Sequence, residues 1–315
     1  MAGNANYDAL LTSTLENIRS TLEDNVFTAR PLTYWLTRKD RIRTVGGGNK
    51  IVEPLIYGLN STAGSYASYD TLDTTPQEGI TAAEYDWKQF AATVAISGIE
   101  QAINMGQEAV FNLLEAKVMQ AEESISEGFN TMFHSDGSGN SGKDWWGLAA
   151  AVDSADPSVA NFGNIDRDTN TWWASTETNV AGALSLPAMA TLYNTVSKGS
   201  IHPDFILTDQ DEFEKYETLL QPQLRFSDTK TVDGGFQNFL YKDAVVMFDD
   251  ANAAGVMYFL NSKYLKLVRH SSVWFKNTPF QTPVDGDASY SKILCYGNLT
   301  ASNCQRLGKL TGLTD

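Results

Sequence analysis

Apolar residues recur at helical spacing in two segments of the first half of the chain. Leucine and isoleucine residues over 7–24 predict a short amphipathic helix. The segment 97–133 predicts a long helix, which Ser97 and Glu100 begin with the pattern of a capping box. The polar face of this helix is strongly acidic, with Glu115 and Glu122 among its members, so we expect it to meet solvent or a basic neighbour.

Two strands are predicted between these helices, over 50–57 and 85–96. The first is rich in Ile, Val and Tyr, and the second alternates apolar and polar residues. The residues between them, 58–84, are polar and contain few bulky aliphatic side chains. A hairpin with so long a polar tip does not bury itself in its own domain. We therefore expect the hairpin to lie on another molecule.

The remaining pattern predicts a mixed α+β unit. Helices are expected over 184–196 and 209–220, the second with Asp209 as N-cap. Strands are expected over 203–208, 244–248, 256–260, 264–268 and 292–296, and 153–180 reads as a polar loop. The segment 26–48 reads as an extended arm that ends in a turn at three consecutive glycines.

The chain is strongly acidic, with a formal net charge of -15 over 315 residues. Such a surface does not favour phosphate binding, because nucleic-acid affinity comes largely from clustered Lys and Arg. The one dense basic run contains Arg38, Lys39, Arg41 and Arg43, which we interpret as a solvated or subunit-contacting face rather than a DNA site. No export signal or membrane span is expected, and two cysteines fit synthesis in a reducing cytoplasm.

Candidate chemistry in the sequence is weak. Asp166, Asp168, Asn170 and Glu177 have the spacing of a calcium loop, but Thr171 stands where the sharp turn needs glycine. The glycine run 137–142 follows a helix instead of a strand, so we interpret it as a flexible connector and not a phosphate loop. We expect no bound metal, no cofactor and no catalytic activity.

Several local strings, in their order along the chain, resemble the Hong Kong 97 fold family of tailed-phage major capsid proteins. They are Gly47-Gly48 with Ile51 and Pro54-Leu55, Asp136-Gly137 followed by Gly147-Leu148, Ile165-Asp166-Arg167 with Trp172, Pro203-Asp204 before Phe-Ile-Leu, and Gly297-Asn298-Leu299-Thr300. The resemblance covers nearly the whole chain from about residue 35.

The resemblance implies an α+β capsid fold with four parts. These are an N-terminal arm over 1–45, an extended β-hairpin loop over 46–96, a peripheral domain with a spine helix over 97–144 and 270–315, and an axial domain over 145–269. It also implies a structural subunit of an icosahedral phage head that assembles as hexamers and pentamers around packaged double-stranded DNA, without sequence-specific DNA contact. An encapsulin, a cellular shell protein of the same fold, is the alternative.

The implied partners are copies of the same chain, a separate scaffolding protein, a portal and head decoration proteins, with no membrane. The chain is expected in the virion, and in the host cytoplasm during assembly. We expect a subunit interface that includes Arg38, Arg41, Arg43, Tyr57, Tyr66, Tyr69, Trp87, Glu115 and Glu122. A soluble hydrolase or binding protein built on the calcium-like loop is a second alternative.

Overall fold

The computed structural model describes residues 30–103, 113–154, 159–220, 239–282 and 286–314, except for the side chains of 101–103 and 113–115. The helix expected over 7–24 and the side chain of Glu115 lie outside the described residues. The chain divides into two compact units. Of the described residues, the first unit contains those within 90–128 and 272–295, and the second those within 30–89, 129–271 and 296–314.

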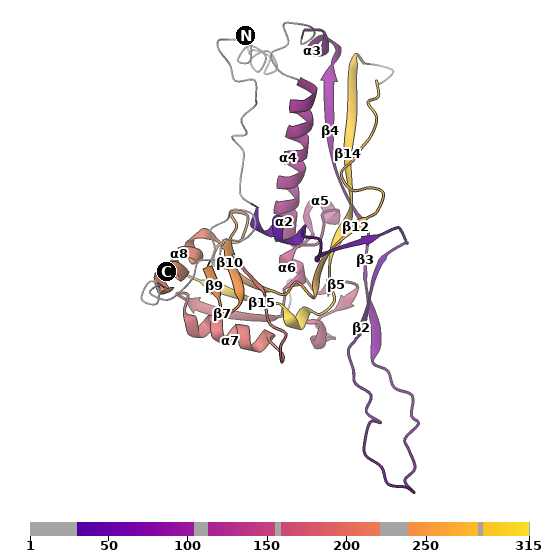
Figure 1. Cartoon of the computed structure of the whole chain (residues 1–315), viewed down its shortest axis with the longest axis vertical. Helices are drawn as coiled ribbons and strands as arrows, with labels where there is room; N and C mark the ends of the chain where they lie inside the picture. The colour runs from indigo at the N-terminus through magenta and orange to yellow at the C-terminus, as the bar shows by residue number, and fades with distance from the viewer. Residues whose placement is uncertain (1–29, 104–112, 155–158, 221–238, 283–285, 315) are drawn as a thin grey trace. The chain divides into compact units, whose positions relative to one another are not determined.

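The second unit contains a six-stranded sheet of strand order β7-β15-β11-β8-β10-β9. Figure 1 labels four of its strands, β7, β9, β10 and β15. The central strands β8 (Phe205–Thr208) and β11 (Met257–Leu260) are buried at every position. β10 (Ala244–Phe248) runs parallel to β8, and β9 (Phe239–Tyr241) forms one edge. β7 (Thr176–Gly182) forms the other edge and runs parallel to β15 (Gly308–Leu313).

Two helices pack on this sheet. α7 (Leu186–Val196) contacts β7 and β15, and α8 (Gln210–Leu220) contacts β10. α7 begins where the Ser185 side chain accepts a hydrogen bond from the Ala188 amide, which satisfies one amide left free at a helix start. Met189, Ile206, Phe259 and Leu310 are fully buried in the core between helix and sheet.

A second sheet has the order β1-β12-β14-β13, and β4 also pairs with β14. In the second unit, β1 (Ile42–Val45) runs parallel to β12 (Leu265–His270), which is antiparallel to the last residues of β14 (Ala288–Ala301). In the first unit, earlier residues of β14 pair with β13 (Lys276–Asn277). β4 spans Lys88–Ser97, and its buried side chains alternate with exposed ones as predicted.

The long helical prediction for 97–133 is confirmed where the structure describes it, as α3 (Gly98–Ile103) and α4 (Leu113–His134). Residues 104–112, between the two helices, lie outside the described residues. The capping box is confirmed, because the Ser97 amide donates to the Glu100 carboxylate at 3.0 Å and the Glu100 amide donates to the Ser97 hydroxyl at 3.3 Å. Lys117 of α4 forms an ion pair with Glu100 at 2.8 Å.

The remaining elements of the second unit are short. They are the helices α2 (Pro31–Leu36), α5 (Gly139–Gly142) and α6 (Leu148–Ala151), the strands β2 (Ile51–Ile56), β3 (Ile80–Tyr85), β5 (Asn161–Phe162) and β6 (Ile165–Asp166), and the 3-10 turns η2 (Thr171–Trp173) and η4 (Cys304–Arg306). Among the helices that the structure describes, none is long and apolar enough to cross a membrane.

Most predicted elements of the second half are confirmed, including both helices over 184–220 and the strands within 203–208, 244–248, 256–260 and 264–268. The extended arm over 26–48 is wrong in one part, because 31–36 forms helix α2. Pro31 stands in the first helical turn, where its missing amide hydrogen costs nothing, and Leu32, Trp35 and Leu36 are buried on one side. Trp35 stacks on Phe205 with ring centroids 4.8 Å apart.

Two further predictions need correction. The polar loop expected over 153–180 ends in strand β7, which the chain stabilises by parallel pairing with β15 from its C-terminal end. The hairpin strand expected over 85–96 is β4, which pairs with β14. The true partner of β2 is β3 at 80–85, so the connecting loop is shorter than predicted and spans 57–79.

Candidate subunit-contact surface

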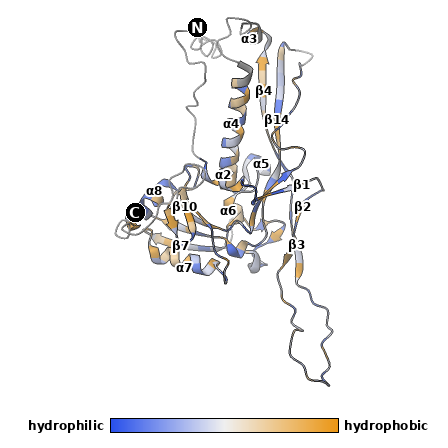
Figure 2. Cartoon of the chain, viewed as in Figure 1, coloured by the Kyte–Doolittle hydropathy of each residue, from blue (hydrophilic) through white to orange (hydrophobic). Residues whose placement is uncertain are grey.

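The β2–β3 hairpin is a two-stranded antiparallel ribbon that contains residues of high hydropathy (Figure 2). The strand register places Ile51 opposite Tyr85 on one face, which we call the inner face, and Ile56 opposite Ile80 on the other, the outer face. Side chains of the inner face are buried in the second unit, with Ile51 and Tyr85 each 1% exposed. On the outer face, Ile56 is 77% and Ile80 78% exposed, which leaves apolar surface uncovered.

The inner face is held at its base by Tyr85. The Tyr85 hydroxyl donates to the Ala301 carbonyl at 2.9 Å and accepts from the Ala301 amide at 3.2 Å. Burial raises the pKa of Tyr85 well above its usual value, so the phenol stays neutral and can keep donating. Beside it, the Glu84 amide donates to the Gly163 carbonyl at 2.9 Å, and the Tyr85 ring meets Phe162 edge-on. These contacts fix the ribbon to β5 and β14.

A second support lies at the far end of the ribbon, where the strands meet the loop. Tyr57 stacks on Trp172 of η2 with ring centroids 5.0 Å apart. The Gly79 carbonyl accepts from the amides of both Tyr57 and Gly58. A Cβ atom on Gly79 would lie 2.7 Å from the Gly58 carbonyl oxygen, so the close approach of the two chains requires glycine here. The loop therefore starts from a fixed and narrow neck.

The loop 57–79 presents large apolar side chains to the outside. Leu59 is 94%, Tyr66 68%, Tyr69 99% and Leu72 59% exposed. The hydrogen bonds that the structure describes within 58–79 join loop residues to one another, such as the Ser61 hydroxyl to the Gln77 side chain. Loops of this length that lack regular structure usually carry function.

The loop is also acidic, since it contains Asp70, Asp73 and Glu78 and no Lys or Arg. The Asp70 carboxylate accepts from the Ala67 amide at 2.7 Å, and that of Asp73 accepts from the Thr75 amide at 2.9 Å. The hydrogen bond from the Thr75 hydroxyl lowers the pKa of Asp73. Both carboxylates are thus held in local turns of the loop.

The sequence-predicted interface residues fall into separate places. Tyr57, Tyr66 and Tyr69 lie in the loop just described, and Trp87 is half-buried below the hairpin, where its indole nitrogen donates to the Gly48 carbonyl at 2.9 Å. In the first unit, Glu122 is exposed on α4.

The predicted basic run divides into exposed and buried members. Arg38 and Arg43 are exposed, and Arg43 forms an ion pair with Glu53. Arg41 is instead buried over the Trp35 ring, 4.3 Å from its centroid, and its guanidinium lies 3.7 Å from Asp204. Burial lowers the pKa of Arg41, although Asp204 and Asp40 oppose the shift. Since Arg41 contacts its own subunit, it takes no part in the interface that we propose below.

The calcium-like spacing does not gather its residues into a metal site. The Asp166 carboxylate accepts from the Asp168 amide and the Thr169 hydroxyl, as in an ordinary polar turn, and Asn170 accepts from the Trp172 indole. Glu177 lies on β7, where it pairs with Lys309 at 3.2 Å. Among the described residues, no group of three or more metal-binding side chains comes together.

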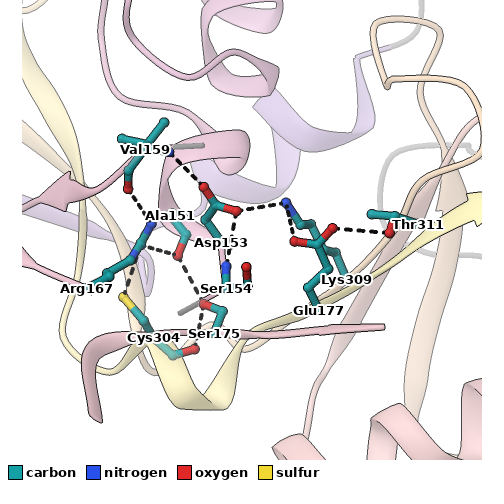
Figure 3. Close-up of polar contacts among 10 residues, drawn as sticks. All are labelled: Ala151, Asp153, Ser154, Val159, Arg167, Ser175, Glu177, Cys304, Lys309 and Thr311. Carbon is teal, nitrogen blue, oxygen red and sulfur yellow. Dashed lines mark hydrogen bonds and ion pairs between the residues drawn. The ribbon is translucent and has the colours of Figure 1, made fainter. Parts of the chain in front are cut away.

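Glu177 lies at the exposed end of a polar cluster that the sequence did not reveal and that is otherwise mostly buried (Figure 3). Lys309 of β15 bridges Glu177 and the buried Asp153, with Nζ to Asp153 at 3.2 Å. Arg167 is fully buried close by and donates to the carbonyls of Ala151 at 3.1 Å and Val159 at 3.4 Å. Because a buried charge is stable only with such partners, the cluster fixes the segment that carries β5 and β6 under the hairpin.

Both cysteines are buried as free thiols. Cys304 lies in the same cluster, with its sulfur 3.9 Å from Arg167, and burial raises its pKa to about 11. Cys295, in the first unit, also has a pKa raised to about 11 by burial. A thiol reacts as its thiolate, so neither side chain is suited to nucleophilic chemistry.

A second buried network centres on Asp249 and joins α2, the end of α4 and the end of β10. The Asp249 carboxylate accepts from the Asn130 side chain at 2.9 Å and from the Leu32 amide at 3.4 Å. His134 Nδ1 donates to the Asn130 carbonyl at 2.8 Å, and its Nε2 lies 3.8 Å from Asp249. Burial lowers the pKa of His134, while Asp249 and the Asn130 carbonyl oppose this effect. The network holds α2 in place.

The glycine run 137–142 forms a tight turn. Asn140 and Ser141 have positive φ values of 50° and 58°, and the next helix, α6, has only four residues. A phosphate loop would need a longer helix start directly after it. The structure therefore gives this segment the geometry of a connection between α4 and α6.

Comparisons with known proteins find similar folds among solved structures but no match in the two searches by sequence. No protein-family model matches the chain, and no curated protein matches it. Solved structures match over almost the full length of both chains. The chain of the cyanophage A-1(L) capsid asymmetric unit has a TM-score of 0.72 at 15% identity, covering 96% of this chain and 98% of that chain.

Two other kinds of shell give similar values. A chain from the capsid of the native GTA particle has a TM-score of 0.66 at 11% identity, covering 99% of this chain and 100% of that chain. The holo-SrpI encapsulin of Synechococcus elongatus has a TM-score of 0.63 at 12% identity, covering 99% and 96%. The fold of this chain is therefore the Hong Kong 97-type capsid fold, as the resemblance of the sequence strings implied.

Proposed function

We propose that this chain is the structural subunit of an icosahedral phage head, which assembles into hexamers and pentamers and encloses packaged double-stranded DNA. The observation that carries the proposal is the outer face of the hairpin with its loop. Ile56, Ile80, Leu59 and Tyr69 are each more than three quarters exposed, and an isolated two-stranded ribbon has little stability of its own. Copies of the same chain would cover this surface.

Burial of the exposed apolar side chains between copies would stabilise the assembly, as it does in obligate interfaces. Burial of apolar surface contributes about 25 cal/mol per Å², so several large side chains on each copy, repeated around a ring, stabilise an assembly strongly. A monomeric protein with these side chains exposed would instead be prone to aggregation. The matching capsid and encapsulin chains are shell proteins, which agrees with assembly of this chain into a shell.

We propose the four-part division that the resemblance implies, with one change. The N-terminal arm covers 1–45, the extended loop 46–96, and the peripheral domain 97–144 and 270–307. The axial domain covers 145–269 and takes in 308–313 as well, because β15 pairs with β7 and β11 in the six-stranded sheet. The strand pairing is the reason for moving 308–313, and the rest of the division follows the resemblance.

We propose no catalytic role, no cofactor and no bound metal. The proposed partners are other copies of the chain, a separate scaffolding protein, a portal, decoration proteins and DNA held without sequence-specific contacts. The net charge of -15 supports the last point, since an acidic container does not bind DNA tightly. The chain would be synthesised in the host cytoplasm and would end in the virion.

An encapsulin-type compartment is the second candidate, because the SrpI encapsulin shares the fold at a TM-score of 0.63. The two functions differ in what the particle encloses. Particles purified from the native source should contain nuclease-protected DNA if the chain is a phage head protein. A packaged protein cargo without DNA would favour the encapsulin.

The proposal is tested by expressing the chain and observing it by size-exclusion chromatography and negative-stain electron microscopy. We expect particles from the wild type, that is, ring-shaped capsomers or closed shells, because closure of the shell is the step that a separate scaffolding protein would assist. A variant with 60–77 replaced by a short Gly-Ser linker should give a folded subunit that no longer forms stable particles, since the deletion leaves both hairpin strands intact. A variant that fails to fold, together with a wild type that stays monomeric at high concentration, would contradict the proposal.

A further inference from the structure

A cluster of basic residues lies at one end of the β1–β12 strand pair. The two strands are parallel, with Ile42 opposite Leu267, so the segments that precede them meet at the same end. One segment brings Arg38 and Lys39, and the other brings Lys263. Lys266 Nζ donates to the Asp40 carbonyl at 2.7 Å, which places the two segments in contact.

We call this cluster the basic edge and define it as Arg38, Lys39, Arg43, Lys263 and Lys266. Arg38, Lys39, Arg43 and Lys263 are exposed, and Lys266 is half-buried. Asp40 lies in the same segment, Glu53 pairs with Arg43, and the buried Arg41 pairs with Asp204. With these included, six basic groups stand against three acidic groups, an excess of three. Such an excess stands out in a chain whose net charge is -15. The sequence showed only the first half of this cluster.

The basic edge adjoins the base of the hairpin. Glu53, the partner of Arg43, belongs to β2, and the Thr300 hydroxyl of β14 lies 3.5 Å from the same carboxylate. The acidic loop 57–79 is at the other end of that hairpin and has an excess of three acidic groups. One chain therefore carries complementary charges at the two ends of one ribbon.

We propose that the acidic loop of one copy docks on the basic edge of the next copy, so that the contact runs from hairpin tip to hairpin base. This inference rests on the proposed shell function and specifies which two surfaces of that shell meet. Opposite charges attract over about 8 Å at physiological ionic strength, and they align the approaching copies before apolar side chains such as Tyr69 make contact.

The contact is heterologous, because the two surfaces are different parts of the chain. A heterologous contact closes into a ring when its rotation divides a full turn evenly and otherwise forms an open filament, whereas a contact between identical surfaces stops at a dimer. Tip-to-base docking thus accounts for ring-shaped capsomers with one kind of interaction. Nucleic acid is the less favoured occupant of the basic edge, since an excess of three charges gives weak phosphate binding against the repulsion of an acidic chain.

Charge reversal tests the docking directly. The edge variant is Lys39→Glu with Lys263→Glu, and the loop variant is Asp73→Lys with Glu78→Lys. We expect each to lower particle yield at least about tenfold at roughly 0.15 M salt, because like charges would then face each other. The combination of all four substitutions restores opposite charges and should return the yield to within about twofold of wild type.

Lys143→Glu with Lys198→Glu is the matched control, because it changes the net charge equally at exposed lysines outside the basic edge. We expect it to assemble like the wild type. Each variant is first checked for a wild-type circular dichroism spectrum. Normal assembly of the edge variant would overturn the docking but leave the shell function standing, and so would failure of the fourfold variant to recover.

Two further outcomes also decide the matter. Normal particle yield from the edge variant with reduced DNA content would assign the basic edge to nucleic acid and overturn the docking. A control variant as defective as the edge variant would show an effect of net charge alone, which also overturns it. A wild-type chain that forms no particles at all would overturn the proposed function together with this inference.

Discussion

The six-stranded sheet and the β2–β3 hairpin contain the same apolar residue types, but the sheet buries them and the hairpin leaves several of them exposed. In β8 and β11 every residue is buried by helices and neighbouring strands of the same chain. In β2 and β3 only alternate residues are buried, yet the exposed ones include Val52, Ile56 and Ile80. A ribbon meant to face water would carry polar residues there. An apolar strand therefore predicts that its side chains are buried, but it does not predict whether the same chain or another molecule buries them.

The largest effect is expected where the chain covers itself. Phe259→Ala in β11 removes a fully buried ring from the sheet core and should lower the free energy of unfolding of dissociated subunits by about 3–5 kcal/mol. Urea denaturation followed by tryptophan fluorescence measures this loss. A loss below about 1 kcal/mol would show that the core repacks around the gap, and the contrast with the hairpin would weaken.

An intermediate effect is expected at His134, whose Nε2 atom is buried without a hydrogen bond among the described residues. Burial lowers the pKa of His134 in the folded state, so below the ordinary value of 6.5 the unfolded chain takes up a proton that the folded chain does not. Stability is therefore complete above pH 6.5 and falls as the pH decreases, by at most about 1.4 kcal/mol per pH unit.

The measurement compares the pH dependence of unfolding between wild type and His134→Gln, which cannot take up that proton. The variant should lose part of the slope just below pH 6.5. His202→Gln, at a half-buried histidine, is the matched control. Equal slopes in the wild type and in His134→Gln would mean that the attraction of Asp249 offsets the effect of burial, so that the pKa of His134 is the same in the folded and unfolded states.

The smallest effect on the subunit is expected on the outer face of the hairpin. Ile56→Ser with Ile80→Ser should change the free energy of unfolding of the dissociated subunit by less than about 0.5 kcal/mol, because both side chains are more than three quarters exposed. The same variant should lose most of its particles. Ile51→Ser on the inner face is the control and should cost the subunit about 3 kcal/mol. A stable double variant that assembles normally would remove the outer face from the interface.

The local sequence pattern was sufficient to predict many elements of the second unit. The Phe-Ile-Leu run of β8 and the helical spacing of Leu192 and Val196 in α7 identified their elements, because each pattern is complete within a few residues. The capping box at Ser97 was equally readable. Helix α2 carried a readable signal too, since Pro31 precedes apolar residues at helical spacing, but the neighbouring basic run suggested an arm.

The elements and contacts that the sequence did not predict depend on residues far apart along the chain. β7 has the sequence Thr-Glu-Thr-Asn-Val-Ala-Gly, in which β-branched residues stand at alternate positions but only Val180 among them is apolar. This weak pattern does not define a strand by itself, and β7 is stabilised by pairing with β15 from more than a hundred residues away. The pairing of 80–85 with β2 was hidden by the polar stretch around it. The stacking of Tyr57 on Trp172 depends on a contact distant in sequence, so composition and spacing contained no sign of it. For the basic edge, the sequence showed the run that contains Arg38, Lys39 and Arg43, but not that Lys263 and Lys266 join it.

The burial of Cys295 and Cys304 gives the molecule a practical property. Both thiols are inaccessible and have pKa values near 11, so maleimide reagents at neutral pH modify them slowly. A Tyr69→Cys substitution, at a side chain that is 99% exposed, introduces one fast-reacting position without removal of the native cysteines. A fluorophore attached there would change its emission as neighbouring copies enclose the loop, which makes the formation of the shell visible in real time.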